Sequence, residues 1–116
     1  MASSENRPWG SYDILSDAPD CKVKIITVKP QQRISYQFHY KRSEHWVVVS
    51  GAAHITLEDA SFTVPAGQHV FIPTMAKHRI ENTSETEDLV FVEVQCGTCV
   101  YPMIIVGNKY DILCRH

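Results

Sequence analysis

The sequence predicts an all-β fold, a single domain of antiparallel strands arranged as a sandwich or a barrel. Short segments rich in β-branched and aromatic residues recur about every 8–12 residues, with turn-forming residues between them, as is typical of such folds. No window of about 11 or more residues repeats its apolar residues with the 3.6-residue period of a helix. The length of 116 residues suits one domain and is too short for two ordinary ones.

Most of the expected strands end at a clear turn signal. Lys22–Lys29 is rich in β-branched residues and stops at Pro30, and Trp46–Ser50 is a run typical of a buried strand that stops at Gly51. The segment Leu89–Gln95 also has the composition of a strand. The remaining expected strands are 34–39, 53–58, 61–64, 69–72 and 79–81.

We expect the domain to consist of three parts. Residues 1–20 form an N-terminal arm, 21–98 the barrel, and 99–116 a C-terminal tail. In the tail, residues 103–106 fit either a strand or a helical turn. Trp9 in the arm could act as a lid on a site, but we expect it to close one barrel end or to cover an edge strand.

Composition excludes several classes of protein. With 44% apolar and 21% charged residues, the chain is too apolar to be intrinsically disordered. Lys and Arg number 11 against 13 Asp and Glu, so no basic surface for nucleic acid is expected. The longest apolar runs have about five residues, whereas a membrane span needs about 20. The N-terminus lacks the apolar region of a signal peptide, so we expect a cytoplasmic protein that binds neither nucleic acid nor membrane.

The cysteine pattern agrees with that location. Cys96 and Cys99 form a C-x-x-C pair, which could be redox-active or half of a zinc knuckle. No second pair of this kind exists, and no βαβ pattern surrounds this one. We therefore expect ordinary reduced thiols near a strand end.

Four side chains are placed so that they could share one metal ion. Gln37 and His39 lie two residues apart on an expected strand, so both side chains face the same way. Glu44 follows a short polar turn, and His78 comes from a separate hairpin. Such a mixed set of nitrogen and oxygen donors suits zinc, and also manganese, iron, cobalt or nickel. It leaves one coordination position for water or substrate, as catalytic sites do.

Each histidine taken singly has a plainer interpretation, because a histidine on a strand is usually hydrogen-bonded in place or exposed. His45 follows Glu44, so strand alternation turns it away from the metal. His54 could carry protons if its strand faces inward. We expect no functional role for His69 and His116.

Residues 31–51 resemble the first motif of the cupin family. His39, Glu44 and Gly51 stand at the positions of that motif. Gln31 replaces the leading Gly of the family, and Gln37 replaces its first His.

Residues 67–82 resemble the second cupin motif. Gly67, Pro73, His78 and Asn82 match it, while Met75 stands where the family has Gly. Both motifs have the internal spacing and the separation that small cupins show. The resemblance implies a single-domain cupin, an antiparallel jelly-roll barrel.

Further segments narrow the resemblance to one branch of that family. Arg7–Tyr12, Val28–Pro30, Ser43–Gly51 and 92–98 are similar to the cupin module of type II phosphomannose isomerases. In many bacteria that module is the C-terminal part of a chain that also carries a mannose-1-phosphate guanylyltransferase. The similarity extends from about residue 7 to 98, and nothing in the sequence resembles a nucleotidyltransferase.

The resemblance implies a metal-dependent aldose–ketose isomerase that converts mannose 6-phosphate into fructose 6-phosphate. It also implies zinc as the cofactor, bound by Gln37, His39, Glu44 and His78. The reaction moves a proton between C1 and C2 through a cis-enediol. It needs a metal to polarise oxygen atoms, a group to carry the proton, and cations to hold the phosphate.

Three basic residues near these motifs are candidates for the remaining roles. Arg42 occupies the place of a basic residue that the related isomerases use in catalysis. Arg33 and Lys41 are candidates for contacts with the phosphate or the sugar. Glu93 and Gln95 share one strand face, which we expect to point toward solvent.

The tail departs from the related isomerases, and this leaves other functions open. Their acidic stretch after residue 98 is missing, and Val106 stands near the position of an expected Arg. The alternative is a non-catalytic cupin that binds a metal or a small molecule. A metal-dependent oxygenase fits less well, because Gln37 replaces the first ligand of the usual three-His-one-Glu set. We also expect a homodimer, by analogy with small cupins and because exposed edge strands need covering.

Overall fold

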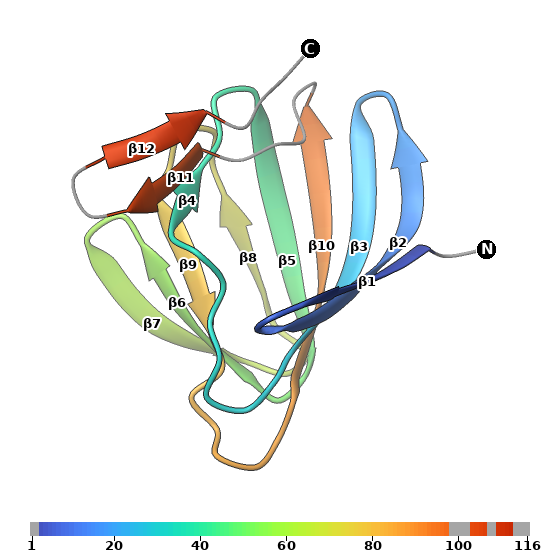
Figure 1. The fold of residues 1–116 in the computed structure, drawn as a ribbon, viewed down its shortest axis with the longest axis vertical. Coiled ribbons are helices and arrows are strands. Elements are labelled where there is room, and N and C mark those ends of the chain that lie inside the picture. The colour runs from blue at the N-terminus through green and yellow to red at the C-terminus, as the bar shows by residue number, and fades with distance from the viewer. Residues whose placement is uncertain (1–2, 98–102, 107–108, 113–116) are drawn as a thin grey trace.

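The computed structural model describes residues 3–97, 103–106 and 109–112, which form twelve strands and no helix (Figure 1). The strands make two six-stranded sheets in which every pairing is antiparallel. The first sheet contains, in spatial order, β1 (Ser3–Arg7), β2 (Gly10–Ala18), β3 (Cys21–Val28), β10 (Leu89–Gly97), β5 (Arg42–Ser50) and β8 (His69–Ile72). The second sheet contains β12 (Lys109–Ile112), β11 (Met103–Val106), β4 (Gln37–Phe38), β9 (His78–Glu81), β6 (Ala52–Leu57) and β7 (Ala60–Pro65). Because the described residues include no helix, none of them forms a helix that could span a membrane.

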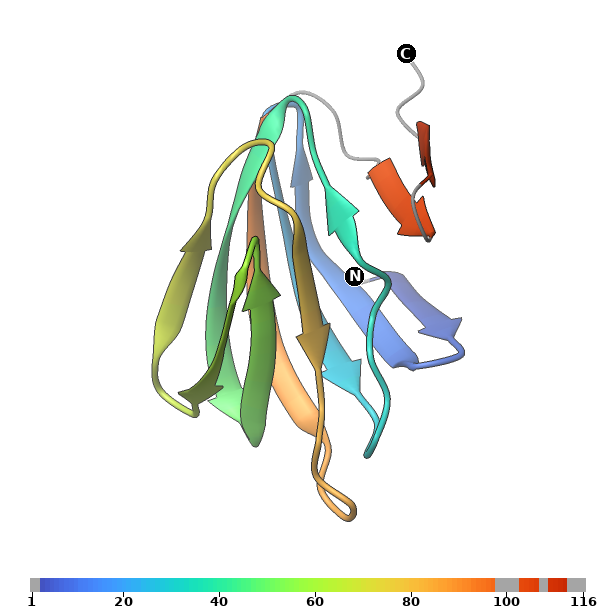
Figure 2. The same cartoon turned by 90° about the vertical axis from the view of Figure 1, so that its left-hand side faces the viewer.

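The two sheets face each other and enclose the core, as a side view shows (Figure 2). This arrangement confirms the predicted all-β jelly roll. Residues 103–106, for which the sequence left two possibilities, form a strand. The segment expected as an N-terminal arm forms β1 and β2 over most of its length, and β2 joins the first sheet beside β3.

The strand expected at 34–39 is much shorter in the structure. Only Gln37–Phe38 forms β4, and it pairs with β9 through Gln37 and His78. Before it, the chain touches β9 through an isolated bridge between Arg33 and Glu81. The side chains of Phe38 and His39 are both buried, so strand alternation ends at this point.

Inward side chains divide the interior into an apolar end and a polar end. Trp46 and Val48 of β5 pack with Phe91 of β10, and the ring centroids of Trp46 and Phe91 lie 5.6 Å apart. Further along the same inward faces, β5 carries Arg42 and Glu44, which are also buried. The strands that build the core therefore deliver charged groups to one end of it.

A close backbone approach fixes the start of β5 beside the end of β10. Gly97 pairs with Arg42 and has a φ of 141°, a conformation that favours glycine. A Cβ atom at this position would collide with the backbone of Lys41 and Arg42. Glycine at position 97 therefore allows β10 to lie close to the start of β5, from which the buried Arg42 side chain points into the interior.

Asn82, the last residue of the second motif, ties loops together at the apolar end. It is almost fully buried, and its Nδ2 donates to the carbonyl oxygens of Val28, at 2.9 Å, and Glu87, at 2.7 Å. Its Oδ1 accepts from the backbone N–H of Ser84 at 3.1 Å. The side chain therefore satisfies three backbone groups at once.

We predict that Asn82→Ala lowers the free energy of unfolding by about 2–4 kcal/mol, because it leaves buried backbone groups without partners. Urea denaturation followed by circular dichroism measures this change. Asn6→Ala serves as the control, since the Asn6 side chain is exposed and its removal should change stability by less than about 0.5 kcal/mol. Equal midpoints for the two variants would contradict the structural role of Asn82.

Candidate metal centre

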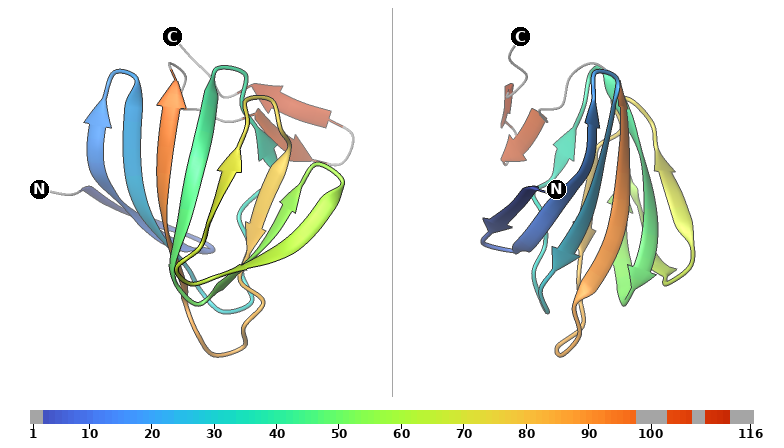
Figure 3. Two further views of the ribbon diagram at one scale, coloured as in Figure 1. Left: turned by 180° about the vertical axis from the view of Figure 1, so that it is seen from behind. Right: turned by 90° about the vertical axis from the view of Figure 1, so that its right-hand side faces the viewer.

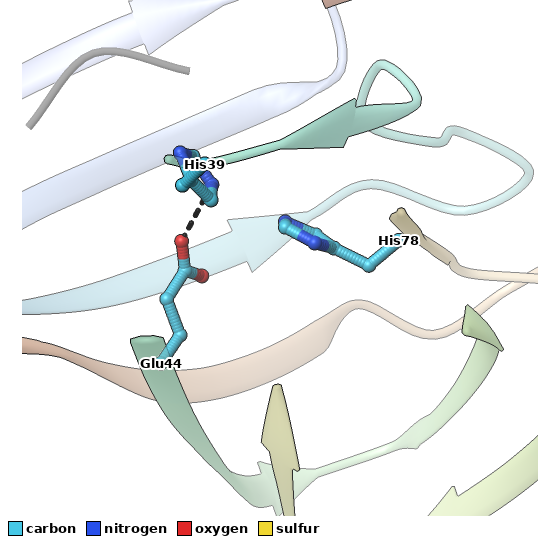
Figure 4. Close-up of side chains that lie close together, drawn as sticks. All are labelled: His39, Glu44 and His78. Carbon is cyan, nitrogen blue, oxygen red and sulfur yellow. Dashed lines mark ion pairs between the residues drawn. The ribbon is translucent and has the colours of Figure 1, made fainter. Parts of the chain in front are cut away.

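Three predicted ligands converge at the polar end of the interior. His39 directly follows β4, Glu44 lies in β5, and His78 begins β9. All three are buried, and each offers a ligand atom within 4.8 Å of those of the other two. Figure 4 shows the His78 ring directed toward the other two side chains. Segments far apart in the sequence thus bring two imidazoles and a carboxylate together.

His78 is held in the orientation of a metal ligand. Its Nδ1 lies 2.9 Å from the carbonyl oxygen of Ala76, and since a carbonyl only accepts, Nδ1 carries the proton. The lone pair then resides on Nε2, the arrangement that metal-binding histidines usually have. Burial lowers the pKa of His78, which favours the neutral form that binds metals.

Glu44 is the charged centre of the cluster. Its Oε2 lies 2.8 Å from His39 Nε2 and 3.0 Å from Nε of Arg42, and its Oε1 accepts from Trp46 Nε1 at 2.8 Å. Burial alone would raise the pKa of Glu44, but the hydrogen bond with His39 and the charge of Arg42 hold it well below its usual range. Glu44 is therefore a carboxylate.

These residues fit a divalent cation. Neutral imidazole and carboxylate are the forms that coordinate zinc and similar ions. Zinc binds such donors at about 2.0–2.2 Å, so atoms within 4.8 Å of one another need only small side-chain rotations to share one ion. The described residues therefore contain a group able to hold a metal ion.

Gln37, the fourth predicted ligand, lies beside this group. It pairs with His78 across β4 and β9, and its Nε2 donates to Ser35 Oγ at 3.0 Å. The amide oxygen is then the atom that could bind a cation. Gln37 and His78 both line a small, half-open pocket. Ligation by Gln37 stays a prediction.

Arg42 lies inside the cluster. It is 5% exposed, and its guanidinium reaches Glu44 at 3.0 Å, Gln95 Oε1 at 3.2 Å and His39 Nε2 at 3.1 Å. A guanidinium stays protonated at any ordinary pH, so Arg42 supplies a fixed positive charge beside the ligands. Its part in catalysis stays a prediction.

The two predicted substrate contacts lie farther out. Arg33 and Lys41 are both exposed, and neither is among the residues that line the cavity. A basic residue that sequence reasoning did not select, Arg79, does line it. Contacts of Arg33 and Lys41 with a substrate stay predictions.

Sequence reasoning missed two polar residues of the interior. Glu93 and Gln95, expected to face solvent, are buried on the inward face of β10. The Nε2 of Gln95 donates to Oε1 of Glu93, and Glu93 lines the cavity together with Gln37 and His78. Burial, and then the neighbouring Glu44 carboxylate, raise the pKa of Glu93 to about 8. A second buried carboxyl therefore stands next to the candidate ligands.

The other histidines of the described part lie outside this site. His45 and His69 are exposed on outward positions of β5 and β8, as expected for His45. His54 lies on β6 between the fully buried Ala53 and Ile55, so alternation turns it outward. His116 and Cys99 fall outside the described residues, and Cys96 is an exposed free thiol.

Sequence comparison finds one matching family and several longer relatives. The model of the family described as mannose-6-phosphate isomerase C-terminal matches residues 1–106. The alginate biosynthesis protein AlgA of Pseudomonas aeruginosa is 45% identical over 92 residues, which cover 79% of this chain and 19% of that protein. The mannose-1-phosphate guanylyltransferase RfbM of Salmonella typhimurium is 38% identical over 92 residues, with the same coverage of both chains. The chain thus spans about a fifth of the length of these relatives.

Solved structures of low sequence identity share the fold. A cupin-2 domain protein of Rhodospirillum rubrum aligns with a TM-score of 0.80 and 13% identity, over 91% of this chain and 76% of that one. An RmlC-like cupin of Shewanella frigidimarina aligns with a TM-score of 0.75 and 15% identity, over 84% and 85%. These similarities show that the domain has the cupin fold.

Proposed function

This chain belongs to the mannose-6-phosphate isomerase C-terminal family, and we propose that it is a metal-dependent isomerase that interconverts mannose 6-phosphate and fructose 6-phosphate. The observation that carries the proposal is the buried cluster of His39, Glu44 and His78 beside a cavity that also contains a second carboxyl, Glu93. An aldose–ketose isomerisation needs ligands that hold a metal ion and a separate group that takes and returns a proton.

We assign the metal to Gln37, His39, Glu44 and His78, with zinc as the ion. When bound there, a divalent cation would polarise the carbonyl and hydroxyl oxygens of the sugar. The carboxylate of Glu44 belongs to this set, so it is unsuited to carry the proton, because a cation stabilises its deprotonated form.

We assign proton transfer to Glu93, which lines the cavity and stands outside the ligand group. In its deprotonated form, which a pKa of about 8 makes the minor form at neutral pH, Glu93 takes the proton from C2 of the aldose and returns it to C1 of the enediol. A second proton passes from the oxygen on C2 to that on C1. Arg42 remains a cation throughout, so its part is to hold Glu44 and to stabilise the negative charge that develops on the enediol oxygens.

The phosphate needs a cation at the mouth of the site. We propose Arg33 and Lys41 for this contact, with Arg79 of the cavity wall as a further candidate. Arg79 lies over the ring of Tyr36, with 5.7 Å between the guanidinium carbon and the ring centroid, which fixes its direction.

The test is turnover of mannose 6-phosphate by the metal-loaded protein. Purified chain is dialysed against a chelator, reloaded with zinc or manganese, and assayed for fructose 6-phosphate. We expect turnover only in the reloaded samples, and none from Glu44→Gln under the same conditions. Full metal occupancy without turnover would contradict the isomerase and favour a non-catalytic metal-binding cupin.

A further inference from the structure

Two cysteines lie directly opposite each other on neighbouring strands of the first sheet. Cys21 begins β3, Cys96 stands one residue before the end of β10, and the antiparallel register pairs the two. Viewed from behind, the start of β3 and the tip of β10 lie side by side (Figure 3, left). In the sequence Cys96 belongs to a C-x-x-C with Cys99, but the fold places it beside a thiol from a distant part of the chain.

Both thiols lie on the outward side of the sheet. Burial alternates along β10, where Phe91, Glu93 and Gln95 are buried, so Cys96 points outward, and it is exposed. Direct partners in an antiparallel pair share one face, so Cys21, which is half-buried, lies on the same side. A dissolved reagent can therefore reach Cys96, and Cys21 is its neighbour across the strands.

The backbone hydrogen bonds make this a pair of the narrow kind. The N–H of Gly97 donates to the carbonyl oxygen of Asp20 at 3.0 Å. The residues next to the two cysteines thus form a hydrogen-bonded pair, and Cys21 and Cys96 form a non-hydrogen-bonded one. The Cα atoms of such a pair are about 4.5 Å apart, and those of disulfides are roughly 4.4–6.8 Å apart. The two residues are therefore within reach of a covalent bond.

We propose that Cys21 and Cys96 form a reversible disulfide when the protein meets a low-molecular-weight disulfide such as oxidised glutathione. The Cys96 thiolate attacks one sulfur of the reagent, whose S–S bond breaks to release one thiol. The Cys21 thiolate then attacks Sγ of Cys96 and releases the second thiol. The protein loses two protons and two electrons, and the two released thiols carry both away. The proposal is independent of the enzymatic activity.

The position of the bridge determines its properties. A Cα separation near the lower limit strains a disulfide, so a thiol reductant should open it again. The closed bridge would join β3 to the end of β10, where Gln95 and Gly97 flank Cys96 and both meet Arg42. It would also close a long loop of the chain, which restricts the unfolded state and so stabilises the folded one.

Peptide mapping of the full chain tests the proposal. The reduced wild type is incubated with oxidised glutathione, alkylated, digested with trypsin without reductant and analysed by mass spectrometry. We expect a link between the peptide that contains Cys21 and the peptide that contains both Cys96 and Cys99. The double variant Cys99→Ser/Cys114→Ser keeps only the two proposed cysteines, and it should form the same link and lose it on addition of dithiothreitol.

Thermal unfolding of the double variant gives a second measurement. After removal of free reagent, the oxidised sample should unfold at least about 5 °C above the reduced one, because the bridge restricts the unfolded chain. Reduction of the oxidised sample should return the midpoint to its starting value.

Val23 provides a matched control, since it lies on the same face of β3, two residues after Cys21. Adding Cys21→Ser and Val23→Cys to the double variant keeps two thiols on this face but sets their Cα atoms about 7–8 Å apart, beyond the reach of a disulfide. We expect this control to form only mixed disulfides with glutathione.

Three results would overturn the proposal. One is a double variant that keeps free thiols or carries two separate glutathione adducts. Another is a Val23→Cys control that forms the bridge as readily as the double variant. The third is a wild type in which Cys96 bonds to Cys99 instead, seen as a bond within a single peptide.

Discussion

Glu44→Gln should leave the protein unable to hold a divalent metal ion, and isomerase activity should fall to the background rate. The carboxylate is the anionic donor of the cluster, and its Oε2 lies 2.8 Å from His39 Nε2. An amide has nearly the same shape and no charge, so the variant tests the charge itself. We expect metal content to fall from about one ion per chain to less than about a tenth after dialysis, as measured by elemental analysis.

Thermal or urea unfolding gives a second reading of the same loss. A ligand that binds only the folded state stabilises it by about 2.7 kcal/mol when present at 100 times its dissociation constant. The wild type should gain this stability on addition of zinc, and Glu44→Gln should gain none. The comparison remains valid if the variant is less stable without metal, which we expect because Arg42 loses the anion that it contacts at 3.0 Å.

His78→Gln should also lower the metal content and abolish the stabilisation by zinc, because it removes a neutral nitrogen ligand. His69→Ala is its control, because His69 is an exposed histidine on the outer side of β8. Metal content equal to wild type in both His78→Gln and Glu44→Gln would show that the cluster is not a metal site. The isomerase proposal would then lose its main support.

The convergence of His39, Glu44 and His78 could be anticipated from the sequence, because these residues stand at matching positions of the two cupin motifs. Gln37 and His39 are two residues apart, and the turn that follows returns the chain at Glu44. The structure places His39 and Glu44 at bonding distance, with His78 beside them. The strand expected at 34–39 was too long, since only Gln37–Phe38 forms β4. Both Phe38 and His39 are buried, which the alternation of a regular strand does not predict.

Glu93 and Gln95 were assigned to the wrong side of β10 for a physical reason. On this strand Leu89 and Phe91 point inward, but the outward positions are valines, so both faces are apolar. Hydrophobicity then cannot distinguish the two faces, and polar residues are assigned to solvent by default. One feature of the sequence does indicate the correct side. Glu93 lies two residues after Phe91, a large aromatic residue, so the two side chains point to the same side of the strand.

The second large effect is expected from Glu93→Gln, which should lower kcat by about 100- to 10,000-fold, the range that a proton-transfer group contributes. Glu93 is buried, lines the cavity next to His78, and stands on the strand beside β5, where Gln95 is the direct partner of Glu44. The replacement amide can still accept the hydrogen bond that Gln95 donates, so the surroundings should change little. What it loses is the ability to take and return a proton.

Two further readouts distinguish this role from a structural one. Metal content and KM should remain within about threefold of wild type, because Glu93 is not one of the proposed ligands. In D₂O, incorporation of solvent deuterium at C2 of mannose 6-phosphate should fall in proportion to kcat, since exchange requires the same proton removal. Glu85→Gln, on an exposed loop, should change none of these quantities. A Glu93→Gln variant that exchanges deuterium at the wild-type rate would exclude this carboxyl as the proton carrier. The base would then have to be another residue of the chain, and not Arg42, because a guanidinium cation cannot accept a proton.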